Sequence, residues 1–549
     1  MKPALIPSIW LLPILSGWLL SLSCPPQSLT PTVWIALVPL FVFLAHDPRP
    51  LRALWGGWLS GLTYALIIVH PLLSLVWWGW ALTSEEYTAS LRQQQRFLHV
   101  WYPLTALWCS MWWGLWGAAL VWLARSARSR VWWAAALWLL ICEHLRRVTF
   151  FDFTWGFLGY ALHPYPVLRQ LAAVTGILGL SALIVLVNAW IAHALRACWA
   201  LLRPSSAHGG ATPTHALREL GLAASVLGAA LGSWGLGVQN ASHREEAGSA
   251  TISVATLQVS PHTYTKEEYA AGALDWTYTP LLEGALERGA KLLVLPEGVW
   301  LAKLRLDETP LPATLSRHVR PSEIAADLAQ WLGDSGAVVL VGFDVATQGH
   351  LYNSIVSWDA QGLRSQYHKR RLTPFAEYPP GPFRHLAPRN RLTFTPGQGA
   401  QLFAVDSLRV GGFICQEAQF PDLIRQSVRE GAQLLVSSGN DGIFRHPAVA
   451  EGHHIAAIFR AIETHRPLVR AMKTGISSII DPHGQVLTAA GIKQEALLLR
   501  DVAASHRTTF YTRWGDWLVG LCAALTLTIG LLRLISLLAA RRRDVPERV

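Results

Sequence analysis

The sequence predicts a protein of two parts, a bundle of membrane-spanning helices and a polar α/β domain. Of its 549 residues, 52% are hydrophobic and only 15% are charged, and the mean hydropathy is +0.29. Soluble globular proteins carry about 25% charged residues, so this composition indicates membrane-embedded surface. Most of the Lys, Asp and Glu nevertheless fall between about 240 and 510, which is the length of an ordinary folded domain. The two observations exclude both a purely soluble enzyme and a purely transmembrane one.

Eight apolar stretches approach the length of about 20 residues that crosses a bilayer. They lie near 4–22, 32–46, 53–80, 98–124, 131–146, 168–202, 216–238 and 514–540. We therefore predict a transmembrane helical domain of about seven spans over 1–240, an α/β domain over 245–510, a last membrane helix over 514–540 and a basic tail over 541–549. The first stretch also resembles a signal peptide, but a protein with several spans rarely needs one, so a first span is favoured.

The positions of Lys and Arg set the predicted orientation, because cytoplasmic connections carry the excess of basic residues. Basic residues gather at the N-terminus and in the second, fourth and sixth connections: Lys2, Arg49, Arg52, Arg125, Arg128, Arg130, Arg196, Arg203 and Arg218. The tail with Arg541 is then also cytoplasmic, which places 245–510 on the extracytoplasmic face. The net charge of +11 favours an anionic lipid surface over nucleic acid as a partner, since the α/β domain has no Lys/Arg-rich motif.

The cysteines single out one residue for chemistry. Five of the six fall in or beside predicted spans, and only Cys415 lies in the α/β domain. In an oxidising compartment such a cysteine is either a buried apolar residue or a reactive thiol. The strand Arg409 to Ile414 ends at Cys415, and a helix is predicted from about Pro421 to Arg429. A strand, a sharp turn and a helix expose a nucleophile and place backbone N–H groups beside it, so we favour the reactive thiol.

Two further polar residues follow hydrophobic strands of the same domain. The run from Lys291 ends in Pro296-Glu297, and strands predicted over 337–346, 351–359 and 363–370 lead to Lys369. Alone, Glu297 would be an acid at a helix N-terminus, and Lys369 would be a solvated charge at a strand end. Because strand ends of one sheet edge converge, we predict instead that Glu297, Lys369 and Cys415 form a catalytic triad of base, oxyanion donor and nucleophile.

These residues carry a resemblance to a known family. Glu297, Lys369 and Cys415, in this order, resemble the Glu-Lys-Cys triad of the carbon–nitrogen hydrolase (nitrilase) superfamily. Longer segments resemble the apolipoprotein N-acyltransferase family within it. These are Glu143-His-Leu-Arg146, Phe153-Thr-Trp155-Gly-Phe-Leu-Gly159-Tyr160, Gln170-Leu-Ala-Ala, Gly176-Ile-Leu-Gly179-Leu-Ser181, Arg371-Leu-Thr-Pro-Phe-Ala-Glu377-Tyr, Gly439-Asn440-Asp441 and Arg460-Ala-Ile-Glu463-Thr-His-Arg466-Pro467. The resemblance covers nearly the whole chain.

The resemblance implies a fold, a reaction and a location. The α/β domain is expected to be an αββα sandwich of the nitrilase type. The reaction expected is transfer of a fatty acyl chain from a phospholipid, through a thioester at Cys415, to the α-amino group of the lipidated N-terminal cysteine of a bacterial lipoprotein. The location expected is the inner membrane, with the catalytic domain facing the periplasm. Roles in orienting the triad residues or in binding the substrate are expected of Glu377, Glu417, Gln416, Asn440 and Arg466.

The sequence departs from the family around the presumed pocket. Gln416 stands where an aromatic residue is usual, Ile443 follows Asn440-Asp441-Gly442 where a Trp-Phe pair is usual, and Lys473 replaces an Asn. A paralogous acyltransferase with another amine acceptor therefore stays open. So does a membrane-tethered amidase, although a tether needs one helix rather than eight. A non-catalytic scaffold is disfavoured by the intact triad.

Neither a metal nor a nucleotide cofactor is predicted. Glu451-Gly-His453-His454 is a histidine cluster without the i, i+4 spacing of a helical zinc site, and no cysteine accompanies it in the sequence. We interpret His453 as a packing or pocket-lining residue. The Gly-Gly pairs at 209–210 and 411–412 are not followed by a Walker-type lysine, so nucleotide binding is not expected.

Overall fold

The computed structural model describes most of both predicted parts of the chain. The described residues are 9–74, 84–124, 127–149, 153–202, 228, 251–259, 278–299, 303–309, 318–374, 376–378, 393–444 and 446–543. Two compact units emerge, one of residues 1–70, 102–237 and 514–549, and the other of residues 71–101 and 238–513. The predicted span 216–238 lies almost entirely outside the described residues.

Two β-sheets form the centre of the second unit. Among the described residues the first sheet has eight strands in the order β14-β1-β2-β5-β3-β4, with β6 paired to β5 and β7 paired to β6. Its strands are β1 (Thr251–Gln258), β2 (Leu292–Glu297), β3 (Lys303–Arg305), β4 (His318–Val319), β5 (Val338–Thr347), β6 (His350–Asp359), β7 (Gly362–His368) and β14 (Ala496–Ala503). Strands β1, β2 and β5 are parallel, whereas β5, β6 and β7 form an antiparallel meander.

The second sheet has six described strands in the order β13-β12-β11-β10-β9-β8. They are β8 (Leu402–Val405), β9 (Leu408–Ile414), β10 (Leu434–Gly439), β11 (Leu468–Met472), β12 (Ser478–Ile480) and β13 (Val486–Ala489). The central strands β9, β10 and β11 are parallel to one another. Their apolar runs are continuous because a parallel strand is covered on both faces.

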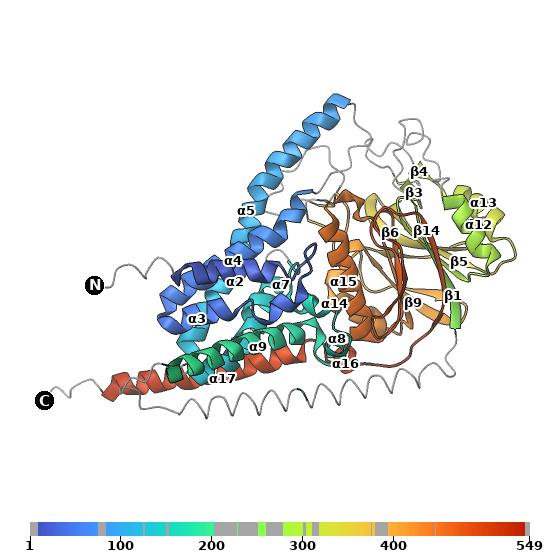
Figure 1. Cartoon of the computed structure of the whole chain (residues 1–549). Coiled ribbons are helices and arrows are strands. Elements are labelled where there is room, and N and C mark those ends of the chain that lie inside the picture. Colours follow the sequence, from blue (N-terminus) through green and yellow to red (C-terminus); the bar gives the residue numbers. More distant parts are fainter. Residues whose placement is uncertain are drawn as a thin grey trace. The chain divides into compact units, whose positions relative to one another are not determined.

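Alternation along β2 shows why a strand of this sequence is buried on both sides. Leu292 and Val294 pack into the core between the two sheets, while Leu293 and Leu295 pack into the core beneath the helices. The helices that cover Leu293 and Leu295 are α12 (Thr279–Glu287) and α13 (Pro321–Leu332). On the other side of the strands lie α14 (Pro421–Arg429) and α15 (Pro447–Thr464), so the unit is an αββα sandwich (Figure 1).

The first unit is helical. Its longer helices are α2 (Leu11–Ser21), α3 (Val38–His46), α4 (Pro50–Val69), α5 (Ser84–Leu123), α6 (Ala127–Leu137), α9 (Ala172–Leu202) and α17 (Trp517–Arg543). Of these, α5 is shared, because its residues up to Trp101 belong to the second unit. Short helical turns complete it: η1 (Thr30–Trp34), the π-helix η3 (Trp138–Leu145), α7 (Arg146–Val148), η4 (Leu158–Leu162) and α8 (Pro166–Arg169). By length and composition, three described segments suffice to cross a membrane: Pro50–Ser74, Leu98–Leu123 and Ala172–Trp199. Shorter apolar helices cover Leu11–Ser21, Thr30–His46 and Trp517–Arg533.

Glycines allow α4 and α5 to approach closely. A Cβ at Gly57 would lie 2.3 Å from the carbonyl oxygen of Trp113, and one at Gly117 would lie 2.6 Å from that of Ala53. Membrane helices use such small residues to bring their backbones into contact, since lipid gives no hydrophobic drive for association. The packing is thus of the kind expected for a membrane bundle.

The structure confirms the predicted fold class. The strands predicted over 337–346, 351–359 and 363–370 correspond to β5, β6 and β7, and the predicted helix Pro421–Arg429 is α14. The sequence also predicts an amphipathic helix over about 265–289. The structure describes only its Thr279–Glu287 part, as α12, because residues 260–277 lie outside the described part.

Candidate active site

Three strand ends carry the residues of the predicted triad. Glu297 is the last residue of β2, Lys369 directly follows β7, and Cys415 directly follows β9. Strands β2 and β7 belong to the first sheet and β9 to the second, so both sheets contribute. The charges of Glu297, Lys369 and Glu377 all act on the Cys415 thiol, so the structure brings these groups together.

Cys415 begins the 3-10 turn η7 (Cys415–Gln419) rather than the helix α14. Its backbone has φ of +51°, a left-handed conformation that is costly for a residue with a side chain and is common at functional turns. The helix that the sequence predicted from Pro421 is present as α14, and the turn η7 separates it from the thiol. Burial raises the pKa of the Cys415 thiol strongly, and the Lys369 ammonium only partly opposes this rise. The resting residue is therefore a thiol that needs a base.

Glu297 has the properties of such a base. Burial raises its pKa from 4.5 to about 7, while the Lys369 ammonium and a hydrogen bond from Asn353 limit the rise. A carboxylate with a pKa near neutrality both accepts and returns a proton at physiological pH. Glu297 can therefore serve as base in one step and as acid in the next.

Lys369 is held as an ammonium by a buried carboxylate. Its Nζ donates to Glu377 at 2.9 Å and to Thr373 Oγ1 at 3.2 Å, and only 2% of the lysine is exposed. Burial alone would lower the pKa of Lys369, but Glu377, Cys415 and Glu297 outweigh burial and raise it. Among the described residues the ammonium has these two hydrogen-bond partners, which leaves one of its three N–H donors for a reacting oxygen.

Asn353 joins the two carboxylates Glu297 and Glu377, and it is not among the site residues predicted from the sequence. Its Nδ2 donates to Glu297 Oε1 at 2.6 Å and to Glu377 Oε1 at 2.7 Å. Asn353 lies in β6, within the run Leu351-Tyr-Asn-Ser-Ile-Val-Ser-Trp358. A buried amide in a strand needs partners, so an Asn in this run was the signal that could have found it.

Glu417 ties the loop after β7 to the turn after β9. It is fully buried, its Oε1 accepts from the N–H groups of Arg370 at 2.7 Å and Arg371 at 3.0 Å, and its Oε2 accepts from Tyr367 Oη and Ile414 N, both at 2.8 Å. These bonds hold the backbone directly after Lys369 and directly before Cys415. Glu417 is thus placed to position two triad residues without contacting their reacting atoms.

The other residues predicted around the site are placed differently. Gln416 follows Cys415 in the turn and is half-buried. Asn440 caps the short turn η8 (Asp441–Ile443) by accepting from Gly442 N at 2.9 Å. Arg466 donates to the backbone carbonyls of Ala432, Thr464, His465 and Arg507. These carbonyl contacts are structural, so a substrate role of Arg466 stays a prediction.

Lys473, one of the residues that depart from the family, contacts the backbone next to the base. Its Nζ donates to the carbonyl of Gly298 at 2.6 Å. Gly298 has φ of +73° and directly follows Glu297. The lysine thereby fixes the turn that carries Glu297.

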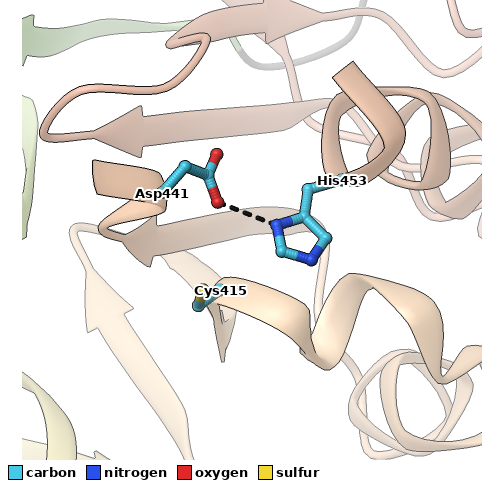
Figure 2. A group of neighbouring side chains, drawn as sticks. All are labelled: Cys415, Asp441 and His453. Carbon is cyan, nitrogen blue, oxygen red and sulfur yellow. Dashed lines mark hydrogen bonds and ion pairs between the residues drawn. The ribbon is translucent and has the colours of Figure 1, made fainter. Parts of the chain in front are cut away.

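A histidine and an aspartate for which no chemical role was predicted, His453 and Asp441, lie beside Cys415. Figure 2 shows His453 directed at Asp441, with Cys415 close to both. The Nδ1 of His453 and Oδ1 of Asp441 are 2.8 Å apart, and one ligand atom from each of the three side chains lies within 4.8 Å of the others. No cysteine lies near His453 in the sequence, but Cys415 in the turn η7 lies near it in the structure. A spacing rule that considers one helix cannot reveal this proximity.

Comparison with known proteins gives two family matches. Residues 253–510 match the carbon-nitrogen hydrolase family, and residues 16–190 match the apolipoprotein N-acyltransferase N-terminal domain. The chain is 32% identical to the apolipoprotein N-acyltransferase of Gloeobacter violaceus, over 93% of this chain and 91% of that protein. It is 29% identical to that of Geobacter metallireducens, over 98% and 96% of the two chains. An amidase from Nesterenkonia sp. is a solved structure with 19% identity and a TM-score of 0.35, covering 46% of this chain and 91% of that one.

The fold and the matched domain define the class of protein. The α/β unit is a carbon–nitrogen hydrolase domain attached to a helical unit of membrane type. The chain belongs to the apolipoprotein N-acyltransferase family, because the similarity covers both units and nearly the whole length. The resemblance seen in the sequence is confirmed, and the enzyme is an N-acyltransferase.

Proposed function

We propose that this enzyme transfers a fatty acyl chain from a membrane phospholipid to the α-amino group of the lipidated N-terminal cysteine of bacterial lipoproteins. The proposed intermediate is a thioester at Cys415. Membership of the family supports the overall reaction, and the chemistry of the site supports the route. The enzyme would reside in the inner membrane, with residues 245–510 on the periplasmic side.

In the first half-reaction Cys415 attacks the ester of the phospholipid. Glu297 takes the proton from the thiol, and the thiolate sulfur forms a bond to the ester carbonyl carbon. The tetrahedral oxyanion then collapses and the bond from carbon to the glycerol oxygen breaks. Glu297 returns its proton to this oxygen, so the lyso-phospholipid leaves neutral at that position. The acyl chain remains on Cys415 as a thioester.

Lys369 and the backbone N–H of Gln416 would stabilise the oxyanion. The ammonium already donates to Glu377 and Thr373, which fixes the direction of its third N–H. A donor that is oriented before the reaction costs no reorganisation when the charge develops. Glu377 acts in this scheme as a positioning residue for Lys369.

The second half-reaction returns the enzyme to its resting state. The amine of the acceptor attacks the thioester carbon, and Glu297 removes a proton from the nitrogen as the new amide bond forms. The carbon–sulfur bond then breaks, and the released thiolate takes the proton from Glu297. The two steps balance and require no cofactor, oxidant or reductant.

One observation carries the proposal most strongly. A partly buried carboxylate with a pKa of about 7 acts on a buried thiol and a buried ammonium, and all three groups lie at strand ends. A hydrolytic amidase could use the same three groups. The extended helical unit favours a lipid substrate, because a small soluble amide would need at most one membrane anchor.

Mass spectrometry of the peptide that contains Cys415 tests the proposal. The full-length enzyme in detergent is incubated with phospholipid and no lipoprotein. We expect a mass gain of one fatty acyl chain that hydroxylamine removes and that is absent in Cys415→Ala. Addition of a diacylglyceryl-modified lipopeptide should discharge the adduct onto the peptide amine. If neither an adduct on Cys415 nor turnover of phospholipid is detected, the proposal is wrong. An adduct that is discharged only by another amine would change the identity of the acceptor.

A further inference from the structure

Cys415, Asp441 and His453 reach one point from three separate elements. Cys415 begins η7, Asp441 begins η8 after β10, and His453 lies in the second turn of α15 (Figure 2). Their exposed fractions are 4%, 3% and 3%, so all three side chains are withdrawn from solvent. A thiol, a carboxylate and an imidazole are thereby concentrated in a small volume of protein.

These three groups are the ligand types of a zinc ion. Zn²⁺ binds thiolate sulfur, imidazole nitrogen and carboxylate oxygen, and three protein ligands with one open position are typical of its non-structural sites. Ca²⁺ and Mg²⁺ prefer sets made only of oxygen ligands, so they do not match this chemistry. The site would therefore select a borderline or soft divalent cation.

The distances allow such an ion after a small movement. The ligand atoms lie within 4.8 Å of one another. A tetrahedral ion with bonds of about 2.0 to 2.3 Å would hold them roughly 3.3 to 3.8 Å apart. Rotation of the side chains that closes the gap by about 1 Å completes the site, and two bonds to the ion replace the bond between His453 and Asp441.

Arg470 supports the carboxylate as an outer partner would. Its Nη2 donates to Asp441 Oδ2 at 3.0 Å and its Nε donates to the Ile476 carbonyl at 3.1 Å, while Oδ1 faces His453. One oxygen of Asp441 is thus anchored and the other faces the two remaining ligands. Hydrogen bonds of this kind orient metal ligands in known sites.

We propose that Cys415, Asp441 and His453 form a Zn²⁺ site whose occupation blocks the thiol of Cys415 reversibly. On binding, the thiol loses one proton to solvent, its sulfur forms a bond to zinc, and the imidazole binds in its neutral form. The bound sulfur is no longer free to attack a carbonyl carbon. Metal binding stands without the proposed acyl transfer, whereas inhibition rests on Cys415 being the nucleophile of the proposed function.

Binding is tested with Co²⁺ as a spectroscopic substitute for Zn²⁺. Titration of the full-length enzyme in detergent should produce a sulfur-to-cobalt charge-transfer band, and added Zn²⁺ should remove it. The band should be absent in Cys415→Ser, and His453→Gln should weaken the affinity at least about 10-fold. His454→Gln is the matched control, because the neighbouring His454 is directed to Ser478 instead. An equal band in wild type and Cys415→Ser would overturn the site.

Protection of the thiol distinguishes the site from the proposed reaction. Zn²⁺ should slow alkylation of Cys415 by iodoacetamide at least about 10-fold, EDTA should restore it, and His453→Gln should lose the protection. If Zn²⁺ protects Cys415 from alkylation but no acyl adduct ever forms on it, the metal site is supported and the proposed acyl transfer is wrong. If the acyl adduct forms equally fast with and without Zn²⁺, and Zn²⁺ does not slow alkylation of Cys415, the metal site is wrong and the proposed acyl transfer is supported.

Discussion

Asn353 donates to Glu297 at 2.6 Å, and the same nitrogen donates to Glu377 at 2.7 Å. An amide NH₂ has two hydrogens, so each carboxylate receives one. The amide thus separates two negative charges and orients both. It also connects Glu297, the proposed base, to Glu377, the carboxylate that holds Lys369.

Asn353→Ala should impair the base more than the fold. The hydrogen bond from Asn353 lowers the pKa of Glu297 against the effect of burial, so its loss should raise that pKa further. The acid limb of the pH profile of kcat/KM should then move to higher pH, with a loss of about 10-fold or more at neutral pH. Ser357→Ala on the same strand is the control and should leave the profile in place. An unshifted profile in Asn353→Ala would exclude this role.

The triad substitutions should separate the three chemical roles. Cys415→Ala should abolish transfer, and Glu297→Gln and Lys369→Ala should each cost at least about 10²-fold in kcat. In the wild type, activity should rise with pH through about 7, because Glu297 must be ionised to accept the thiol proton. Retained activity in a variant would remove that residue from the mechanism. Melting temperatures near the wild-type value show that the losses are not failures of folding.

Glu297 should also make the stability of the protein depend on pH. Its pKa in the folded state is about 7 and is raised above its ordinary value by burial, so the folded state binds the proton more tightly than the unfolded state. The associated stability is present at low pH and is lost as pH rises through about 7. At pH 8 Glu297→Gln should therefore be more stable than wild type by about 1 to 3 kcal/mol, and near pH 4 the difference should vanish. Chemical denaturation at the two pH values measures this; a difference that does not change with pH contradicts it.

Local patterns in the sequence were sufficient to predict the strand ends. Glu297, Lys369 and Cys415 each follow an apolar run, and such runs indicate buried strands whatever their neighbours are. The meander of β5, β6 and β7 was equally predictable, because each strand is joined to the next by a short turn. The sequence resemblance added the identity of the fold, which apolar runs alone do not determine.

Contacts between segments that are distant along the chain could not be predicted from the sequence. Asp441 and His453 are twelve residues apart and Cys415 precedes both, and their meeting depends on the packing of α15 against η7. Helix α14 begins at Pro421 as predicted, whereas the sequence did not reveal that the turn before it, Cys415–Gln419, is a 3-10 helix. Asn353 was missed because its two partners lie 56 and 24 residues away.

Glu417→Gln should weaken both stability and catalysis. The carboxylate accepts four hydrogen bonds, three of them from backbone N–H groups, and a Gln amide can accept at only one of its two positions. Leaving buried donors without partners costs about 1 to 3 kcal/mol each, so the melting temperature should fall. Tyr367→Phe removes only one donor and should cost about 1 kcal/mol. If Glu417→Gln were no less stable than Tyr367→Phe, the bridging role of Glu417 would be wrong.

Gly342→Ala tests how tightly the backbone at Glu297 is held. A Cβ at Gly342 would lie 2.8 Å from Glu297 Cα and 2.7 Å from Ser438 Oγ, and Ser438 itself donates to the Leu295 carbonyl at 2.9 Å. The backbone of β2 cannot move aside without breaking this link between the sheets, so Ala should displace Glu297 and lower kcat at least about 10-fold. Gly284→Ala in α12 is the control, because among the described residues its Cβ would meet only Leu497, at 3.6 Å. That change should stabilise the helix by about 0.5 to 1 kcal/mol and leave kcat unchanged. Equal kcat in the two variants would show that Glu297 tolerates displacement and that its fixed position is not required.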